Sequence, residues 1–193
     1  MTRANLSLKK YNVFRFDAGC LSLNLVATVR QRGSRANDLM LSPQAFEQWL
    51  QQAGLLNERI EPTEKEFQMA LLLREAIYAT VKALILQQAV NPEDIALINA
   101  YAAFPTAVPQ LDGPDEKLKW ITPHVVCSCI ALIARDAILL VGEIDRGWLK
   151  MCSNPSCQML FVDASSKHQR RWCAMSICGN REKVAAHRQR KKA

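Results

Sequence analysis

The sequence holds few of the side chains from which most active sites are built. Only three histidines occur in 193 residues. There is no glycine-rich loop that could cradle phosphate groups and no His-Glu pattern of a helical zinc enzyme. No serine, histidine and aspartate can be placed together as a nucleophile with its base. These absences predict that the chain is not an enzyme.

The sequence pattern also lacks a secretory leader and a membrane span. The apolar stretch at residues 21–29 comes late for a leader and is interrupted by three polar residues. The longest apolar stretch, residues 125–141, carries Arg135 and Asp136 in its middle, so we expect a buried helix there. We therefore expect a cytoplasmic protein, in a reducing compartment where closely spaced thiols bind metals more often than they form disulfides.

Four of the seven cysteines lie near the C-terminal end in two C-x4-C pairs. Cys152 and Cys157 form the first pair, Cys173 and Cys178 form the second, and fifteen residues separate the pairs. Two pairs of close thiols joined by a short connector suit a tetrahedral zinc site. Two disulfides are the alternative, which the odd cysteine count disfavours, and His168 could replace one thiol in a mixed site. We predict one structural zinc ion held by the four cysteines.

Charge divides the chain unevenly. Residues 1–151 carry 16 basic and 16 acidic side chains, whereas residues 152–193 carry 9 basic side chains against Asp163 and Glu182. The whole formal charge of +7 therefore lies in the C-terminal part. A neutral body with a concentrated basic end is typical of a nucleic-acid-binding appendage. A solvated tail that only aids solubility is the alternative.

The basic end predicts a helix from Asn180, as its N-cap, to about Lys192. Val184 and Ala185 should face the zinc module together with Arg181, which could pair with Asp163. Base readout, if present, should come from arginine or asparagine side chains. The candidate nucleic-acid contacts are Arg170, Arg171, Asn180, Arg181, Lys183, Arg188, Arg190, Lys191 and Lys192.

The rest of the chain predicts a mainly α domain with a small β-hairpin. Capping and stop residues place helices at residues 21–30, 43–53, 63–88, 92–103 and 122–141. A hairpin is expected over residues 111–121, around Asp112-Gly113-Pro114, and a short strand over residues 13–16. Strands at residues 148–151 and 159–162 should flank the first cysteine pair, where Phe161 and Trp172 could form a small apolar floor.

Polar residues inside apolar helices could line a ligand pocket. The candidates are Asn24, Thr28 and Arg135. The alternative is that they form hydrogen bonds within the core. The remaining cysteines, Cys20, Cys127 and Cys129, are expected to be small core residues.

The cysteine pairs and their neighbours resemble the C-terminal zinc finger of the bacterial CGNR family. The resemblance is carried by Cys152 and Cys157, Phe161-Val162-Asp163, Arg171-Trp172-Cys173 and Cys178-Gly179-Asn180-Arg181. Upstream, Ala18-Gly19 followed by Leu21-Ser-Leu-Asn-Leu-Val-Ala-Thr-Val is similar to the start of the ABATE domain that precedes this finger. The resemblance implies a stress-induced transcriptional regulator, although the finger has also been likened to RNA-binding zinc ribbons.

Together these observations predict a two-domain regulator. Residues 1–147 would form a helical domain that senses a small-molecule effector or forms a homodimer. Residues 148–193 would form a zinc finger that presents a basic helix to nucleic acid, DNA rather than RNA. Two alternatives stay open: RNA binding, with Trp172 or Phe161 stacked on an unpaired base, and a zinc-clipped module that docks on an acidic protein partner.

Overall fold

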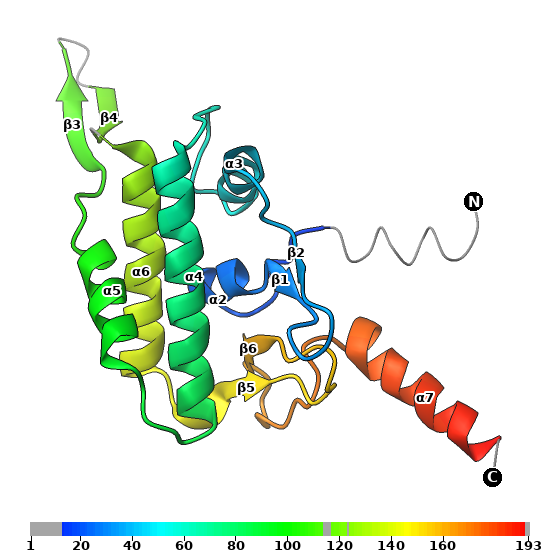
Figure 1. Ribbon diagram of the computed structural model, residues 1–193. Helices are drawn as coiled ribbons and strands as arrows, with labels where there is room; N and C mark the ends of the chain where they lie inside the picture. Colours follow the sequence, from blue (N-terminus) through cyan, green and yellow to red (C-terminus); the bar gives the residue numbers. More distant parts are fainter. Residues whose placement is uncertain (1–12, 114–116, 123, 192–193) are drawn as a thin grey trace, which may run out of the picture.

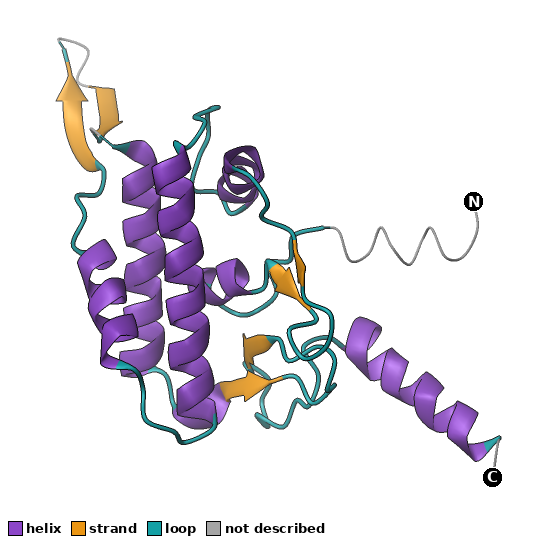
Figure 2. Ribbon diagram, in the orientation of Figure 1, coloured by secondary structure: helices purple, strands orange, loops and turns teal. Residues whose placement is uncertain are grey.

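The computed structural model describes residues 13–113, 117–122 and 124–191 and confirms a mainly α fold with small strand pairs (Figures 1 and 2). The helices are α2 (Leu21–Val26), α3 (Pro43–Gln52), α4 (Glu64–Ile85), α5 (Pro92–Ala102), α6 (Val125–Glu143) and α7 (Asn180–Arg190). A 3-10 turn, η1 (Arg146–Trp148), and a π-helical turn, η2 (Met175–Gly179), complete the helical elements of the described residues. We call residues 13–147 the body and residues 148–191 the finger.

Three separate antiparallel strand pairs accompany the helices. They are β1 (Val29–Arg30) with β2 (Asn37–Asp38), β3 (Val108–Asp112) with β4 (Lys117–Ile121), and β5 (Leu149–Met151) with β6 (Leu160–Val162). The predicted hairpin is β3–β4, and the predicted strands around the first cysteine pair are β5 and β6. Residues 13–16 form no strand, so that prediction was wrong.

Three predicted helix starts in the body are confirmed by their caps, those after Ser42, Thr63 and Asn91. The start predicted at Thr122 was wrong, because α6 begins at Val125 and has no side-chain cap. Ser42 accepts a hydrogen bond from the backbone N–H of Ala45, and Thr63 forms a capping box with Glu66. These side chains satisfy backbone N–H groups that the first helical turn leaves without a partner. Gly54, with φ of +74°, follows the end of α3, because glycine adopts this left-handed conformation without steric cost.

Some helix limits differ from the prediction. Helix α2 ends at Val26 instead of continuing to residue 30, because Val29 and Arg30 leave the helix to pair with β2. Helix α4 ends at Ile85, three residues early, just before Gln87 takes a positive φ. Helix α6 runs through Gly142 to Glu143, so this glycine does not stop it.

Helices α4 and α6 lie side by side as the two long elements of the body (Figure 1). Helix α5 packs on both of them, and α2 packs on both from the side that faces the finger. The buried side chains between them include Leu23, Ile77 and Ile130, all 0% exposed. Burial of this apolar surface is the main stabilising term of the body.

Helix α6 is the one helix of the described residues that is long and apolar enough to cross a membrane, with a mean hydropathy of 2.2. Half of that window is buried inside the protein, with Ile130, Ile133 and Ala134 fully covered. By length and composition this helix could therefore span a membrane, whereas from the sequence we expected no segment that could. Its packing is that of the buried helix we predicted.

The finger is packed against the body and shares one apolar cluster with it. Leu160 and Phe161 on β6 are fully buried in the same cluster as the body helices. The backbone N–H of Val162 donates to the carbonyl of Ala18 at 2.8 Å, so the segment before α2 lines the outer edge of β6. The two predicted domains therefore form one continuous core.

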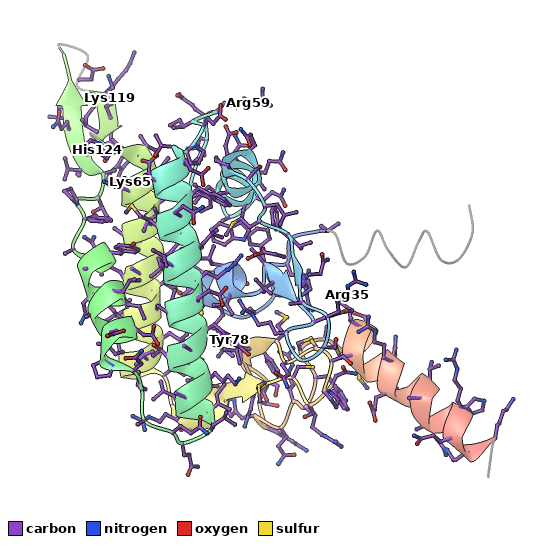
Figure 3. The ribbon with its side chains drawn as sticks, viewed as in Figure 1. Arg35, Arg59, Lys65, Tyr78, Lys119 and His124 are labelled. Carbon is purple, nitrogen blue, oxygen red and sulfur yellow. The ribbon has the colours of Figure 1, made fainter. Side chains whose placement is uncertain are left out.

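A loop of the body also reaches the finger. Ser34 donates to the carbonyl of Ser156, and a Cβ atom at Gly33 would lie 1.8 Å from the carbonyl oxygen of Pro155. Arg32 anchors this loop to α4, since its guanidinium pairs with Glu75 and stacks 4.0 Å above the Tyr78 ring, labelled in Figure 3. The close approach at Gly33 leaves no room for a side chain.

Candidate metal centre and basic helix

The four cysteines of the two C-x4-C pairs come together in the finger, with all four sulfur atoms within 4.8 Å of one another. The Cys173 Sγ atom lies 3.8 Å from that of Cys157 and 3.7 Å from that of Cys178. Disulfide sulfurs would lie about 2 Å apart, so these are not bridges. A zinc tetrahedron with Zn–S bonds of about 2.3 Å has edges of about 3.8 Å. The spacing therefore fits one tetrahedral metal ion.

The strand pair β5–β6 positions the first two thiols. Cys152 follows β5, and its backbone N–H donates to the carbonyl of Met159, just before β6. Between them the chain turns at Asn154, whose carbonyl accepts from Cys157 and whose side chain accepts from the backbone of Ser156. This turn brings Cys157 back toward Cys152 and forms the first chelating knuckle.

The connector between the pairs is organised by Asp163. This residue is 0% exposed, and its carboxylate accepts hydrogen bonds from the backbone and hydroxyl of Ser165 and from the backbone of Arg170. Burial alone would raise the pKa of Asp163, but the hydrogen bonds from Ser165 and Arg170 outweigh it and lower that pKa. The pairing of Asp163 with Arg181 that we considered is replaced by these local bonds.

His168 lies in the connector and outside the sulfur cluster. Its Nδ1 atom is 2.6 Å from the carbonyl oxygen of Asp163, and its ring stacks on Trp148 with centroids 4.4 Å apart. Among the residues that the structure describes, the potential metal ligands that converge here are the four cysteines. The mixed sulfur–nitrogen site is therefore not the arrangement that the chain adopts.

Of the second pair of thiols, Cys178 lies on the turn η2, which leads directly into α7. Cys173 precedes the turn, and the backbone N–H of Cys178 donates to the carbonyl of Ala174. A Cβ atom at Gly179 would lie 2.2 Å from the Met175 sulfur and 3.3 Å from the Trp172 ring. A side chain at Gly179 would therefore have to displace the flexible, exposed Met175 side chain. Because Cys178 and α7 are nearly contiguous, the metal site fixes the start of the helix.

Four thiols this close cannot all lose their protons without a cation between them. Hydrogen bonds from neighbouring thiols lower the pKa of Cys152 to about 7 and lower the pKa of Cys173 further. Hydrogen bonds with the same neighbours raise the pKa values of Cys157 and Cys178, and burial and repulsion by nearby negative charge add to the effect. A divalent cation removes this repulsion, so the donor set matches the thiolate chemistry of zinc.

The aromatic and arginine residues around the centre have mixed roles. Phe161 is fully buried and Trp172 half-buried, so both contribute to the apolar floor we predicted. The Arg170 guanidinium lies over the Phe161 ring and donates to the carbonyl of Cys173, which makes it part of the finger's structure. Arg171 is exposed and lies over the Trp172 ring.

Helix α7 extends away from the rest of the protein (Figure 1) and packs mainly on the turn η2. None of its described residues is buried. Val184, Ala185, Arg181 and Arg188 line one shallow groove beside η2, but Val184 and Ala185 are exposed, so they are not packed against the zinc module as predicted. Asn180 is the first helical residue and its side chain caps nothing, so the predicted N-cap was wrong. Lys192 lies outside the described residues.

The polar residues predicted to line a pocket are held in three separate hydrogen-bond groups. Asn24 accepts from the backbone of Ala18, and Thr28 donates to the carbonyl of Leu25. Arg135 donates to the carbonyls of residues 102 and 104 and to a threonine hydroxyl. They therefore do not share one pocket. A cavity of about 750 Å³ lies elsewhere, at the junction between the end of α4 and β5.

The three cysteines outside the cluster have different surroundings. Cys129 is buried, as predicted, whereas Cys20 and Cys127 are half-buried. Burial raises the pKa of Cys20 to about 11 and that of Cys129 to about 11. These thiols are therefore protonated near neutral pH.

One contact with the metal centre was not anticipated from the sequence. The Nη1 group of Arg15, in the segment before α2, lies 3.5 Å from the Cys173 sulfur. No spacing rule links an arginine 158 residues upstream to a cysteine pair. Only the fold brings the two together.

A helical body joined to a four-cysteine site with a basic terminal helix defines a zinc-finger protein of a regulatory type. Family models place it further: residues 19–143 match the ABATE family, described as "Putative stress-induced transcription regulator", and residues 148–191 match the CGNR zinc finger. The chain belongs to the ABATE family and carries a CGNR zinc finger. Both families point to nucleic-acid binding in general. No curated protein matches the chain closely.

Proposed function

We propose that this protein is a transcriptional regulator that binds duplex DNA through α7 and the adjoining part of its zinc finger. The zinc ion has a structural role, because four cysteines fill a tetrahedral site and leave no open position for catalysis. We accordingly propose that the chain is not an enzyme. Sensing of an effector and formation of a homodimer by the body stay predictions.

The observation that carries this proposal is the isolation of α7. The helix is basic along its length, has no buried residue and is fixed at one end by Cys178. A helix that were only part of the fold would bury an apolar face. An α-helix fits the major groove of DNA, which is about 12 Å wide.

The charge of α7 suits phosphate contact. Lys183 and Arg190 are exposed on the side of α7 away from the groove lined by Val184 and Ala185, and Lys191 is exposed at the end of the helix. Lysine and arginine release condensed counterions when they neutralise phosphates, which makes binding strong at low salt and weak at high salt. The metal centre gives this charge a fixed origin, so the contacts have a defined register.

The helix should gain order on binding. Its eleven residues are fewer than an isolated helix needs to be stable in water, since about 12–15 residues are already marginal. Repulsion between the positive side chains of α7 destabilises the helix further. Phosphates would relieve that repulsion, so we expect the helical content of the protein to rise when DNA is added.

The structure bears on the two alternatives. Phe161 is 0% exposed, so stacking of this ring on an unpaired base would require the finger to open. Trp172 is half-buried, and the Arg171 guanidinium lies over its ring. An acidic protein partner would use the same basic side chains and is separated from DNA only by experiment.

The test is binding of the zinc-loaded protein to duplex DNA, single-stranded DNA and structured RNA over a range of salt concentrations. The variant Lys183→Gln/Arg190→Gln/Lys191→Gln should lower the slope of log affinity against log salt by about 0.9 for each duplex phosphate that it no longer neutralises. The matched control is Arg59→Gln/Lys65→Gln/Lys119→Gln. Figure 3 shows these three residues at the end of the molecule away from α7.

Three results would change the proposal. Equal losses of affinity in the two triple variants would mean that α7 is not the contact surface. Tighter binding to structured RNA than to duplex DNA would favour the RNA alternative. Absence of binding to all three nucleic acids at low salt would favour a protein partner.

A further inference from the structure

The guanidinium of Arg15 connects the segment before α2 with the metal centre. Its Nε and Nη2 groups both donate to the carboxylate of Asp17, and its Nη1 group points at the Cys173 sulfur 3.5 Å away. The side chain is only 10% exposed. An arginine held in this two-sided way has one orientation, because Asp17 fixes the plane of the guanidinium.

The backbone around Arg15 is fixed on both sides. Upstream, Arg30 donates to the carbonyl of Val13 at 2.8 Å. Downstream, the carbonyl of Ala18 accepts from Val162 on β6 at 2.8 Å. Gly19 follows with φ of +102°, where a Cβ atom would lie 2.8 Å from that of Val162. Residues 13–19 therefore lie against the finger as a fixed strap.

The centre needs a positive charge in this position. Four thiolates and one zinc ion together carry a double negative charge, and burying such a charge without a partner is costly. Arg170 and Arg30 also lie close, but their hydrogen bonds go to backbone carbonyls. The guanidinium of Arg15, in contrast, reaches a ligand sulfur.

We propose that Arg15 is a positioning residue of the zinc centre, which donates a charge-assisted N–H···S hydrogen bond to the Cys173 thiolate and is itself oriented by Asp17. Arg15 lies upstream of both family matches, which begin at residues 19 and 148. The working metal site therefore extends beyond the finger, and zinc binding fastens residues 13–19 onto β6. Outer-sphere partners of this kind change metal affinity by about 10- to 100-fold.

The test compares full-length Arg15→Gln and Arg15→Lys with Arg35→Gln as a matched control. Arg35 is exposed on the loop next to the finger, and Figure 3 shows it on the side from which α7 extends. Zinc affinity is measured by competition with a chromogenic chelator, and zinc release by transfer to excess chelator. Arg15→Gln should weaken zinc binding about 10-fold or more, Arg15→Lys should restore part of the loss, and Arg35→Gln should match the wild type.

A spectroscopic measurement separates a direct hydrogen bond from a general effect on folding. With Co²⁺ in place of zinc, a donated N–H bond stabilises the filled sulfur orbitals, so its loss in Arg15→Gln should move the thiolate-to-cobalt charge-transfer band to lower energy. If Arg15→Gln does not fold, the same shift is sought in Asp17→Asn, in which the guanidinium loses its orientation. Wild-type zinc affinity, release rate and cobalt spectrum in both variants would overturn the proposal.

Discussion

The body and the finger share one apolar cluster but owe their stability to different terms. Of the largest fully buried side chains in the described residues, ten belong to the body and only Leu160 and Phe161 to the finger. Burial of apolar surface can therefore stabilise the body. The finger has too little apolar surface for that and depends on sulfur–metal bonds. Loss of the metal should accordingly destabilise the finger much more than the body.

The comparison extends to charge. The body carries 12 basic and 16 acidic side chains, and its described ion pairs, such as Arg74 with Asp38, lie within it. The finger concentrates positive charge on a helix that touches little else. One part contributes most of the apolar core, and the other carries the excess positive charge.

The largest expected effect comes from metal removal. Structural zinc contributes about 10–16 kcal/mol in finger peptides, so chelation should unfold residues 148–191 and leave α4 and α6 folded. Hydrogen exchange read by mass spectrometry resolves peptides of the two parts. Cys173→Ser should reproduce the result, whereas Cys127→Ser, outside the cluster, should not. Equal loss of protection in body and finger would show that the two unfold as one unit.

The next effect tests the contact between the two parts. Gly33→Ala would place a methyl group 1.8 Å from the Pro155 carbonyl oxygen, which forces the loop away from the finger. We expect a loss of about 2 kcal/mol in the free energy of unfolding of the zinc-loaded protein. Gly142→Ala is the control, because this helical glycine faces open space and the change should stabilise by about 1 kcal/mol. Urea unfolding measures both, and a neutral Gly33→Ala would mean that the loop contact is dispensable.

A comparable or slightly smaller effect is expected for Asp163→Asn, within the finger. The amide would turn an N–H group toward donors that now face a carboxylate, at a cost of about 1–3 kcal/mol. The pKa of Asp163 is lower in the folded than in the unfolded protein. The ionised carboxylate therefore stabilises the fold fully above the unfolded pKa, and this stabilisation is lost as the pH falls through the folded pKa. The difference between wild type and variant should therefore stay constant from pH 7 to about pH 5. Asp112→Asn, on the exposed hairpin, should change little.

The smallest effect concerns the body alone. Thr63→Ala removes the capping box of α4 and should lower the free energy of unfolding by about 1 kcal/mol. Thr63→Ser keeps the hydroxyl and should behave as wild type. Zinc affinity should be the same in both variants, since the cap lies far from the sulfurs. A change in zinc affinity would show that the two parts are coupled through α4.

Much of the body could be predicted because its signals are local. Ser42, Thr63 and Asn91 mark helix starts through bonds to backbone groups two or three residues away. The predicted helix limits were wrong where structure outside the local sequence pattern sets the end of the helix. Val29 and Arg30 read as helix until their pairing with β2 is known, and Gly142 reads as a stop until the continuing helix is seen.

The sequence by itself determined the ligand set and the separation of charge. Cysteine spacing is a local property that limits which thiols can chelate one ion, and net charge does not depend on the fold. Only the tertiary structure decided what surrounds the metal: that Arg15 faces Cys173, that Asp163 turns the connector, and that Gly33 touches the first knuckle. The contacts of Arg15 and Gly33 join residues far apart in the chain, which only the packing of the finger against the body brings together.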